Sequence, residues 1–368
     1  MSEPTRQTLF DAGRDGYHTY RIPALLTAAN GDLLAFCEGR RDSVHDSGQI
    51  DIVMKRSTDG GHTWTAQSVV ATEPEMTCGN PCPVLDRETG AIILPFCQNR
   101  SGGGEGLIKQ GKAPRTVWIT RSTDHGATWS APEEITAQVK KNVWTWYATG
   151  PGHAIQLTSG RLLVPCDHTT FVESQGSIHF GSHLIYSDDH GATWHIGALL
   201  SLPGNECCCL ELDDGAVYLN CRTRKEYGVR SYGISRDGGL SFLEEGFHPE
   251  LIEPRQWGGG CEGSLLKIPA GNNDGSWLVF CNPATTEENR RRLALNVSRD
   301  QSRTWAEARV LREGPAGYSD LALLPDDTIV CVYEAGEEMY RERMEIARLP
   351  RAWLVEGLLE APDDFIGA

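Results

Sequence analysis

Three arginines lie beside strand-like segments in separate parts of the sequence and could together bind an anion. They are Arg21 in HTYRIPAL, Arg222 in YLNCR and Arg290 in NPATTEENRRRLAL. A guanidinium group offers fixed, bidentate donors to a carboxylate and stays charged at any working pH. Taken singly, each arginine is better explained as an ordinary surface residue of a strand. If the fold brings the three together, they form a site for an anionic ligand.

Motifs of several other protein classes are absent or incomplete. The sequence contains no HExxH, CxxC or GxSxG, which removes the usual signatures of zinc proteases, zinc fingers and α/β-hydrolases. GGGCEG at 258–263 matches GxGxxG, but the strand-like SLLKI follows where a dinucleotide site needs a helix. GLIKQGK at 106–112 resembles a phosphate loop, yet Ala113 replaces the Ser or Thr that would hold Mg²⁺. We therefore predict neither a metal nor a cofactor.

An octapeptide of the form S-x-D-x-G-x-T-W occurs five times and identifies a repeat protein. Each copy follows a short run with β character. Ser and Asp side chains can bond nearby backbone N–H groups of a tight turn, Gly allows positive φ, and the final aromatic packs the turn onto its own sheet. We expect these acids to be structural. The copies are Ser57–Trp64, Ser122–Trp129, Ser187–Trp194, Ser235–Phe242 and Ser298–Trp305, the last with Ser302 in place of Gly.

The spacing of the copies, about 50 to 65 residues, fits one four-stranded sheet per repeat, the unit of a β-propeller. Strands around QTLFDAG and MEIARL, at the two ends, can complete one blade between them and leave no free edge. We predict an all-β protein, a six-bladed β-propeller of four-stranded antiparallel sheets. No linker divides the chain, so residues 1–368 are expected to form a single domain. The segment SGGGEGLIKQG is expected to be a long loop in the second blade, and RAWLVEGLLEA a helix.

Composition and charge narrow the class further. Of 368 residues, 39% are hydrophobic and 23% charged, which suffices for a large core and argues against disorder. The formal net charge of −16 argues against a general nucleic-acid binder, because phosphate contacts need clustered Lys and Arg. An anionic small ligand is still compatible with this charge.

No segment predicts export or membrane insertion. The N-terminal MSEPTRQTLF lacks a basic stretch followed by an apolar one, and no run approaches the roughly 18 apolar residues of a membrane span. The twelve Cys, three of them consecutive at 207–209, are expected to be buried free thiols in a reducing compartment. These features predict a cytoplasmic protein, or a secreted one if a signal peptide has been removed. They do not specify an oligomeric state.

Several motifs together resemble the sialidase (neuraminidase) family. They are YRIPAL, the Asp-box octapeptides, CEGR, NPCP, GPGHAIQL, NE followed by LEL and NCR, NP followed by RxxL, and GYSDL followed by VYE. They follow the order of the family from Arg21 to about Glu334. Other propellers carry the Asp box, whereas RIP, the two later arginines and GYSDL are highly specific. The resemblance implies a six-bladed propeller that hydrolyses terminal α-linked sialic acids with retention, through a tyrosine nucleophile.

The resemblance assigns the three arginines named above to the carboxylate of sialic acid. Arg291 and Arg292 compete with Arg290 for the third place. Arg290 is preferred because the family places this arginine three residues before a Leu, here Leu293.

The resemblance also implies the catalytic residues. Tyr318 of GYSDL matches the nucleophile, and Glu206 of GNECCCLEL matches its partner carboxylate. Asp46 of HDSGQID matches the acid/base. Asp42 and Asp51 lie close by, but Asp46 precedes SGQ in a loop where an acid can close over substrate.

The chemistry of the substrate explains why a tyrosine suits this place. Sialic acid carries a carboxylate on its anomeric carbon, so an Asp or Glu nucleophile would face a like charge, at a cost of several kcal/mol at a modest dielectric. A neutral phenol avoids this, but its ordinary pKa of about 10 means that Glu206 must take its proton. Asp46 would protonate the leaving oxygen and then activate water. We expect a mildly acidic optimum, with activity falling at alkaline pH as this acid ionises in the free enzyme.

Further residues are expected around the pocket. Glu334 of VYEAG matches the acid that orients the first arginine, and Glu38 of CEGR is expected to orient a neighbour. Vertebrate cytosolic members have tyrosines where this chain has CDHT, so contacts to the glycerol chain or N-acyl group are expected to differ. The other candidates are Arg40 at the pocket edge, Asp167 and His168 of CDHT as pocket or solvated-loop residues, Glu105 of the Gly-rich loop, and Trp144, Trp146 and Tyr147 as walls or core residues.

Three functions are compatible with these features. The first is a retaining exo-α-sialidase that acts on sialylated glycans without metal or cofactor. The second is a related enzyme, either a trans-sialidase or a sialidase that prefers the deaminated sugar KDN. The third is a non-catalytic sialic-acid-binding propeller, which the presence of both Tyr318 and Glu206 disfavours.

Overall fold

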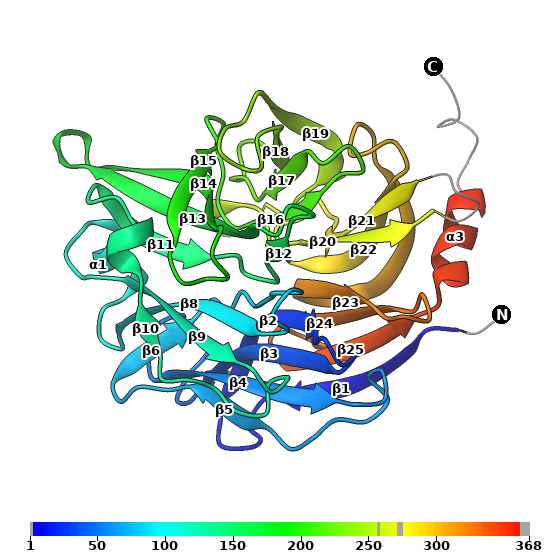
Figure 1. The fold of residues 1–368 in the computed structure, drawn as a ribbon, viewed down its shortest axis with the longest axis horizontal. Coiled ribbons are helices and arrows are strands. Elements are labelled where there is room, and N and C mark those ends of the chain that lie inside the picture. The colour runs from blue at the N-terminus through cyan, green and yellow to red at the C-terminus, as the bar shows by residue number, and fades with distance from the viewer. Residues whose placement is uncertain (1–2, 256–257, 271–274, 361–368) are drawn as a thin grey trace.

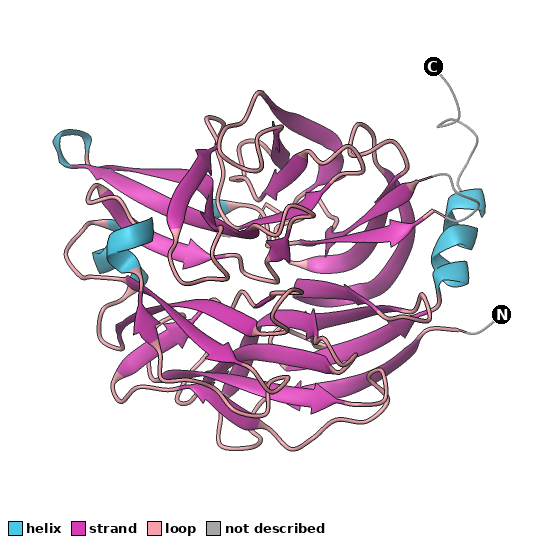
Figure 2. Ribbon diagram, viewed as in Figure 1, coloured by secondary structure: helices cyan, strands magenta, loops and turns pink. Residues whose placement is uncertain are grey.

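Antiparallel strands are the main secondary structure of the described residues, which confirms the predicted all-β class. Figures 1 and 2 show the computed structural model, which describes residues 3–255, 258–270 and 275–360. Among these residues the helical elements are short. They are α1 (Glu105–Lys109), α2 (Thr136–Val139), the 3₁₀ helix η1 (Glu173–Gln175) and α3 (Arg351–Glu360).

Hydrogen bonds group the strands into four sheets, of seven, nine, five and four strands. The seven-stranded sheet consists, in spatial order, of β1 (Thr5–Asp11), β25 (Arg343–Leu349), β24 (Ile329–Ala335), β23 (Ala306–Leu323), β22 (Arg291–Ser298), β21 (Ser276–Pro283) and β20 (Ser264–Pro269). The nine-stranded sheet runs β10 (Glu133–Glu134), β9 (Thr116–Ser122), β8 (Ile92–Arg100), β6 (Met76–Gly79), β4 (Ile50–Ser57), β3 (Leu33–Arg40) and β2 (Thr19–Thr27), with β5 (Ser68–Ala71) beside β4 and β7 (Val84–Leu85) beside β8.

The two smaller sheets occupy the middle of the chain. The five-stranded sheet runs β11 (Trp144–Thr149), β13 (Leu162–Val172), β14 (Ser177–Ser187) and β15 (His195–Leu199), with β12 (Ile155–Gln156) beside β13. The four-stranded sheet runs β16 (Cys207–Glu211), β17 (Val217–Cys221), β18 (Val229–Ser235) and β19 (Glu244–Ile252).

The pairing differs in two places from six separate four-stranded sheets. Strand β23 is 18 residues long and pairs first with β22 and then with β24. A single parallel bridge between Ile50 and Thr77 joins β4 to β6. Because each feature connects strands that would otherwise belong to different sheets, the hydrogen bonds give four sheets rather than six.

The octapeptides form turns at strand ends, as predicted. The strands before them, β4, β9, β14, β18 and β22, each end at the first Ser of a copy. In the first copy, the Gly61 N–H donates to the Ser57 hydroxyl at 2.7 Å and the Thr63 N–H donates to the Asp59 carboxylate at 2.8 Å. The same contacts recur in the other four. The fourth and fifth positions have positive φ throughout, including 74° at Ser302, where Gly would fit more easily.

The two ends of the chain meet in one sheet. β1 pairs antiparallel with β25, so the predicted association of the first and last strands is present. The helix expected at RAWLVEGLLEA is α3, which packs on β23 through Leu354 and a hydrogen bond from Arg309 to the Trp353 carbonyl (Figure 1). The segment SGGGEGLIKQG, predicted as a loop, contains the short helix α1.

Apolar side chains fill the space between neighbouring sheets. One cluster joins Leu163 and Leu184 of the five-stranded sheet to Leu219 of the four-stranded sheet. Others join the nine- to the five-stranded, the four- to the seven-stranded, and the seven- to the nine-stranded sheet. All twelve cysteines are buried and free, as predicted. Within the described part of the chain, no helix combines the length and apolarity needed to span a membrane.

Candidate active site

Tyr318 lies in β23, where the register with β24 shifts between Ala316 and Ser319. Its side chain is largely buried. The phenol O–H donates to Glu206 Oε1 at 2.5 Å and accepts a hydrogen bond from Arg222 Nη1 at 3.1 Å. Burial and the Glu206 carboxylate raise the pKa of Tyr318 well above its ordinary value, although the Arg222 charge acts in the opposite direction. The phenol is therefore neutral at working pH and hydrogen-bonded to a potential base.

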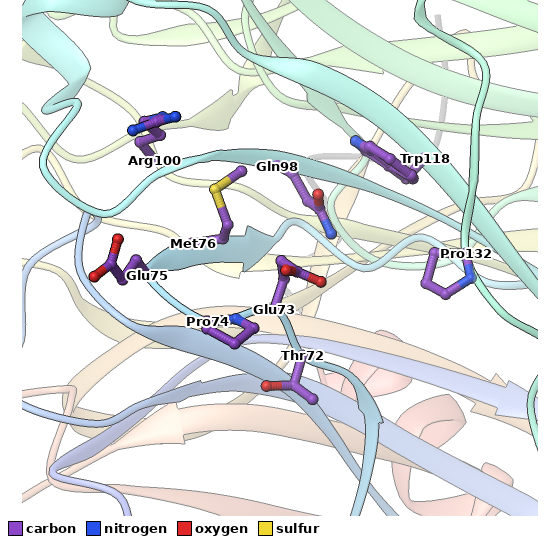
Figure 3. Close-up of a pocket in the computed structure, with 9 residues that line it drawn as sticks. All are labelled: Thr72, Glu73, Pro74, Glu75, Met76, Gln98, Arg100, Trp118 and Pro132. Atoms are coloured by element: carbon purple, nitrogen blue, oxygen red, sulfur yellow. The ribbon is translucent and has the colours of Figure 1, made fainter.

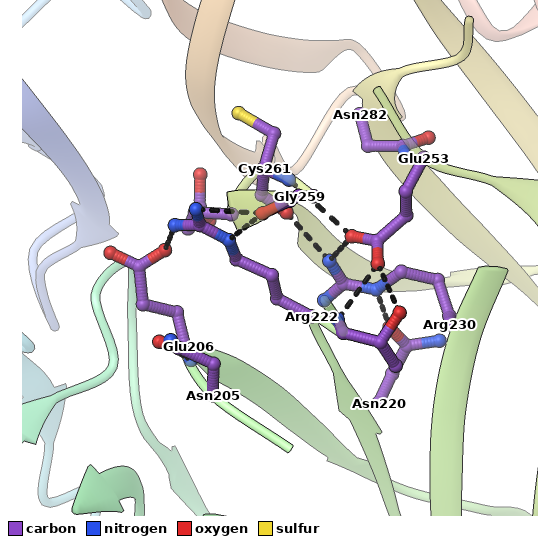
Figure 4. Close-up of polar contacts among 12 residues, drawn as sticks. Asn205, Glu206, Asn220, Arg222, Arg230, Glu253, Gly259, Cys261 and Asn282 are labelled. Atoms are coloured by element: carbon purple, nitrogen blue, oxygen red, sulfur yellow. Dashed lines mark hydrogen bonds and ion pairs between the residues drawn. The ribbon is translucent and has the colours of Figure 1, made fainter. Parts of the chain in front are cut away.

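Cross-strand register brings Glu206 and Arg222 together. Cys207 of β16 pairs with Cys221 of β17, so the residues just outside this pair lie opposite each other. The Arg222 N–H donates to the Glu206 carbonyl at 2.9 Å, and the two side chains form an ion pair at 2.6 Å. Arg222 Nε and Nη2 both donate to the Gly259 carbonyl, at 3.1 and 2.9 Å (Figure 4). The guanidinium is thus fixed from two sides.

A second ion pair supports the loop that carries the Gly259 carbonyl. Arg230 and Glu253 are fully buried and lie 2.7 Å apart, and Arg230 also donates to the Cys261 carbonyl at 2.7 Å (Figure 4). Gly259 has a φ of 99°, and a Cβ there would lie 1.8 Å from the Lys225 nitrogen. The position therefore requires glycine. Sequence reasoning interpreted GGGCEG only as a turn and missed this role of its carbonyl groups.

Glu334 of β24 holds Arg21 and the backbone of Tyr318 together. Its carboxylate accepts hydrogen bonds from Arg21 Nε at 2.8 Å and Nη2 at 3.0 Å. It also accepts the N–H groups of Ile22 at 3.0 Å and Tyr318 at 3.2 Å. Ile22 has a φ of 61°, which is rare for a β-branched residue, and β2 loses register with β3 at this point. Buried hydrogen bonds thus hold the strained RIP segment against β23 and β24.

Arg290 approaches Tyr318 from the segment before β22. Its Cζ lies 5.1 Å from the ring centroid of Tyr318, and Nη2 donates to the Gly260 carbonyl at 3.4 Å. Arg291 and Arg292 instead form ion pairs with exposed acids. The Cζ of the RIP arginine lies 5.0 Å from the same tyrosine ring. The structure therefore brings the three predicted arginines together around one phenol.

Sequence reasoning missed Tyr340, which contacts two of these arginines. The centroid of its ring lies 5.3 Å from Arg21 Cζ and 5.4 Å from Arg290 Cζ. The turn that carries it, between β24 and β25, is held by Glu342, whose carboxylate accepts three consecutive backbone N–H groups at 337–339. In the sequence this turn is the polar segment GEEMYRERM, where no signal distinguishes the tyrosine from a surface residue.

Asp46 lies in the loop between β3 and β4, beside the arginines. Its Oδ1 is 2.8 Å from Arg40 Nη1 and 3.5 Å from Arg21 Nη1. Arg40 is buried and donates twice to Glu38, at 3.0 and 2.7 Å. Burial raises the pKa of Asp46, but the charges of Arg40 and Arg21 outweigh it and lower the pKa to about 2. The Asp46 side chain is 57% exposed, so solvent screens these charges in part.

The two acids near Asp46 are placed differently. Asp51 is fully buried in β4 and accepts hydrogen bonds from Tyr17 and Thr72, each at 2.7 Å. Asp42 is exposed. Of these three acids, Asp46 is the one in contact with Arg21.

Asp167 and His168 point to opposite faces of β13, as successive strand residues do. Asp167 is buried and its carboxylate has no hydrogen-bond partner among the described residues. Burial and the nearby Glu206 raise the pKa of Asp167 well above its ordinary value. His168 stacks on Trp144 at 3.9 Å, and burial lowers its pKa to about 4. Asp167 therefore lies on the side of the site, whereas His168 belongs to an aromatic cluster that also contains Tyr147 and His183.

Glu105 lies at the start of α1, where its carboxylate pairs with Lys109 one turn later. Lys109 Nζ is 5.5 Å from the ring centroid of Trp146 and 4.8 Å from that of Phe180. Arg115 Cζ lies 4.1 Å from the ring centroid of the same tryptophan, Trp146. Lys109 and Arg115 thus lie beside aromatic rings. The structure does not bring Glu105 or His168 into contact with the three arginines.

The comparisons with known proteins define the class to which this fold and site belong. Residues 31–331 match the family described as BNR repeat-like domain. The chain is 34% identical over 349 residues to the sialidase of Micromonospora viridifaciens, which covers 90% of this chain and 52% of that protein. It is 32% identical over 391 residues to Sialidase-3 of Mus musculus, covering 92% of each. The chain thus spans about half of the bacterial relative and most of the mouse one. It belongs to the sialidase (neuraminidase) family of glycoside hydrolases.

Solved structures agree with this membership. The Hadza microbial sialidase Hz136 has a TM-score of 0.80 and 28% identity, covering 94% of this chain and 68% of that one. Trypanosoma rangeli sialidase in complex with sialic acid has a TM-score of 0.79 and 17% identity, covering 98% of this chain and 61% of that one. At 17% identity the second likeness shows the fold alone.

Proposed function

We propose that this protein is a retaining exo-α-sialidase, which hydrolyses terminal α-linked sialic acids of glycoconjugates. The observation that carries the proposal is the hydrogen bond from the Tyr318 hydroxyl to Glu206 at 2.5 Å, beside Arg222 at 3.1 Å. A phenol that is hydrogen-bonded to a carboxylate and surrounded by arginines is suited to attack a carbon that bears a carboxylate group.

The three arginines are proposed to bind the carboxylate of the sugar. Arg21 is paired with Glu334 and Arg222 with Glu206. Arg290, by contrast, donates to a neutral carbonyl and has no ion pair among the described residues. Its charge is available to an anion even though the chain as a whole has a net charge of −16. The forked geometry of a guanidinium also fixes the orientation of the ligand.

The reaction proceeds in two displacements. In the first, the Tyr318 oxygen bonds to the anomeric carbon while its proton passes to Glu206, and the glycosidic oxygen leaves with a proton from Asp46. In the second, Asp46 takes a proton from water, the water oxygen attacks the same carbon, and the tyrosine oxygen leaves and recovers its proton from Glu206. Two inversions at one carbon retain its configuration.

Substrate binding is proposed to prepare Asp46 as an acid. Arg40 and, to a smaller extent, Arg21 lower the pKa of Asp46, and Arg21 is also a proposed partner of the substrate carboxylate. An incoming carboxylate competes for this guanidinium and adds a second negative charge nearby. Both effects raise the pKa of Asp46 toward the working pH. Proton donation is thereby linked to the presence of the acidic sugar.

We also propose that the sheets form a six-bladed β-propeller in a single domain. Dividing the nine-stranded sheet at the bridge between Ile50 and Thr77, and the seven-stranded sheet within β23, gives two blades from each. The two smaller sheets supply one blade each. The apolar clusters connect the four sheets in a cyclic order, which supports a ring.

The test is hydrolysis of a fluorogenic aryl sialoside by the wild type and by Tyr318→Phe. We expect the wild type to release the fluorophore and the variant to lose at least about 100-fold in kcat/KM, because its ring has no nucleophilic oxygen. Tyr232→Phe, which removes an exposed hydroxyl 3.5 Å from Glu244, should leave activity unchanged. NMR of the first product should show the α-anomer.

Other outcomes would reject the proposal. Equal activity of wild type and Tyr318→Phe would exclude the tyrosine nucleophile. Binding of sialic acid without hydrolysis by the wild type would indicate a non-catalytic propeller. Transfer of the sugar to an added acceptor in preference to water would indicate a trans-sialidase.

A further inference from the structure

The loop that carries Asp46 is exposed at its tip and closed at its base. It runs from Arg41 to Gln49, and the Arg41 N–H donates to the Gln49 carbonyl at 3.0 Å. His45 and Asp46 are exposed. Arg40 Nη1 also donates to the Val44 carbonyl at 2.6 Å, so the position of the Asp46 backbone depends on this contact and on what holds the two ends of the loop.

The C-terminal end of this loop is bound to a second segment, Glu73–Thr77, which follows β5 and includes the first two residues of β6. Gln49 Nε2 donates to the Glu73 carbonyl at 3.1 Å, and Gln49 Oε1 accepts the Glu75 N–H at 2.7 Å. The Thr77 hydroxyl donates to the Gly48 carbonyl at 2.8 Å and accepts the Gly48 N–H at 3.3 Å. Two side chains thus make four hydrogen bonds between the loop and its neighbour.

The second segment is itself held by the sheet behind it. Met76 and Thr77 pair with Arg100 and Asn99 of β8, and the Ser101 N–H donates to the Glu75 carbonyl at 2.8 Å. The same segment lines a groove together with residues of β8 and β9 (Figure 3). It therefore offers a fixed support for the more exposed Asp46 loop.

The side chain of Asp46 has two charged contacts, with Arg40 and Arg21. On the proposed mechanism it must leave these contacts to reach the glycosidic oxygen. A proton donor acts only within hydrogen-bond reach of its target, and a displacement of about 1 Å costs roughly 100-fold in rate. The four hydrogen bonds made by the side chains of Gln49 and Thr77, called the clamp below, limit how far the loop can shift when the Asp46 side chain moves.

We infer that Gln49 and Thr77 are positioning residues that place Asp46 for proton transfer to the leaving group. This inference rests on the proposed function. It predicts that loss of the clamp harms only substrates whose departure needs a proton. An aryl leaving group departs as a stable anion, whereas a sugar hydroxyl must be protonated as the bond breaks.

The experiment compares kcat/KM for an aryl sialoside and for a galactose-linked sialoside. Gln49→Leu removes both amide hydrogen bonds at nearly constant volume. We expect kcat/KM to fall about 10-fold for the galactose-linked substrate and less than about twofold for the aryl one. Thr77→Val replaces the hydroxyl by a methyl group. It should change the ratio of kcat/KM for the galactose-linked substrate to kcat/KM for the aryl substrate in the same direction, by a smaller factor.

The matched control is Gln301→Leu in the fifth octapeptide. Gln301 also bridges two backbone segments through its amide, at the Asp213 N–H and the Ser276 carbonyl, but lies in a turn away from Asp46. It should leave the ratio of the two kcat/KM values unchanged. An equal fall for both substrates in Gln49→Leu, or an unaltered ratio, would overturn the inference. If the wild type cleaves neither substrate, it is the proposed function that has failed.

Discussion

The octapeptide turns and the site around Tyr318 use similar hydrogen bonds over very different separations in the chain. In a turn, partners are two to four residues apart: the Asp59 carboxylate bonds to the Ser57 hydroxyl and to the Thr63 N–H. At the site, Tyr318 and Glu206 are 112 residues apart, and Arg21 and Glu334 are 313 apart. A turn can therefore form from its own eight residues, whereas the site requires most of the fold to be in place.

The two regions also treat ionisable groups differently. Burial raises the pKa of Asp189, but the hydrogen bonds from Thr193 and Ser187 together outweigh it and lower the pKa to about 2. This acid stabilises its turn in the ionised form. At the site, burial dominates and keeps Tyr318 protonated beside Glu206. The turns therefore hold their acids in the ordinary charged state, while the site keeps the phenol of Tyr318 protonated beside a potential base.

The largest expected effect comes from Glu206→Gln. The amide keeps the shape of the side chain but cannot accept the phenolic proton, so kcat/KM should fall by about 10²–10⁴. Steady-state kinetics with an aryl sialoside measure this, and a thermal melt shows whether loss of the counter-charge of Arg222 destabilises the fold. Activity within about threefold of wild type would contradict the role of Glu206 as a base.

The pH dependence should separate the free enzyme from the complex. With its arginine contacts in place, Asp46 has a pKa of about 2, so the protonated fraction and kcat/KM for a galactose-linked sialoside should fall as pH rises from about 4 to 8. In the complex the substrate carboxylate raises the pKa of Asp46, so kcat should stay constant to a higher pH before it falls. A kcat/KM independent of pH over this range would count against Asp46 as the proton donor.

A smaller effect is expected in the turns. Asp189→Ala removes the acceptor of its own turn and should lower the free energy of unfolding at pH 7 by about 1 kcal/mol or less, because the group is exposed. The folded-state pKa is depressed, so this stabilisation is complete above the ordinary value of about 3.9 and is lost as pH falls toward about 2. Urea denaturation at pH 7 and pH 2.5 would show the difference shrinking. The exposed Glu134→Ala is the control, and kcat per folded molecule should not change.

The smallest effect is expected from Ser302→Gly. Ser302 has a φ of 74° in the position where the other four copies have Gly. Removing the side chain relieves about 1 kcal/mol of backbone strain, but glycine also gains freedom in the unfolded chain. A net stabilisation of a few tenths of a kcal/mol is expected in urea denaturation. A clear loss of stability would show that the Ser302 side chain contributes contacts that outweigh its strain.

The sequence predicted those features that depend on neighbouring residues or on recognisable motifs. The octapeptides marked five strand ends and their turns, because the acceptors and the positive φ positions are contained in each copy. The motifs around Arg21 and Tyr318 indicated which residues to expect at one site. The short helix α1 was not predicted, since a Gly-rich segment has weak helical preference and depends on packing against its neighbours.

By itself, the sequence determined the β class, the repeat and the turn chemistry, because these follow from local propensity and from bonds within eight residues. Only the tertiary structure decided that Arg290, rather than Arg291 or Arg292, faces the phenol, and that Tyr340 packs beside it. It also decided that Asp46 contacts the guanidinium groups of Arg40 and Arg21. These outcomes depend on register, burial and charge between segments far apart in the chain, which no local pattern encodes.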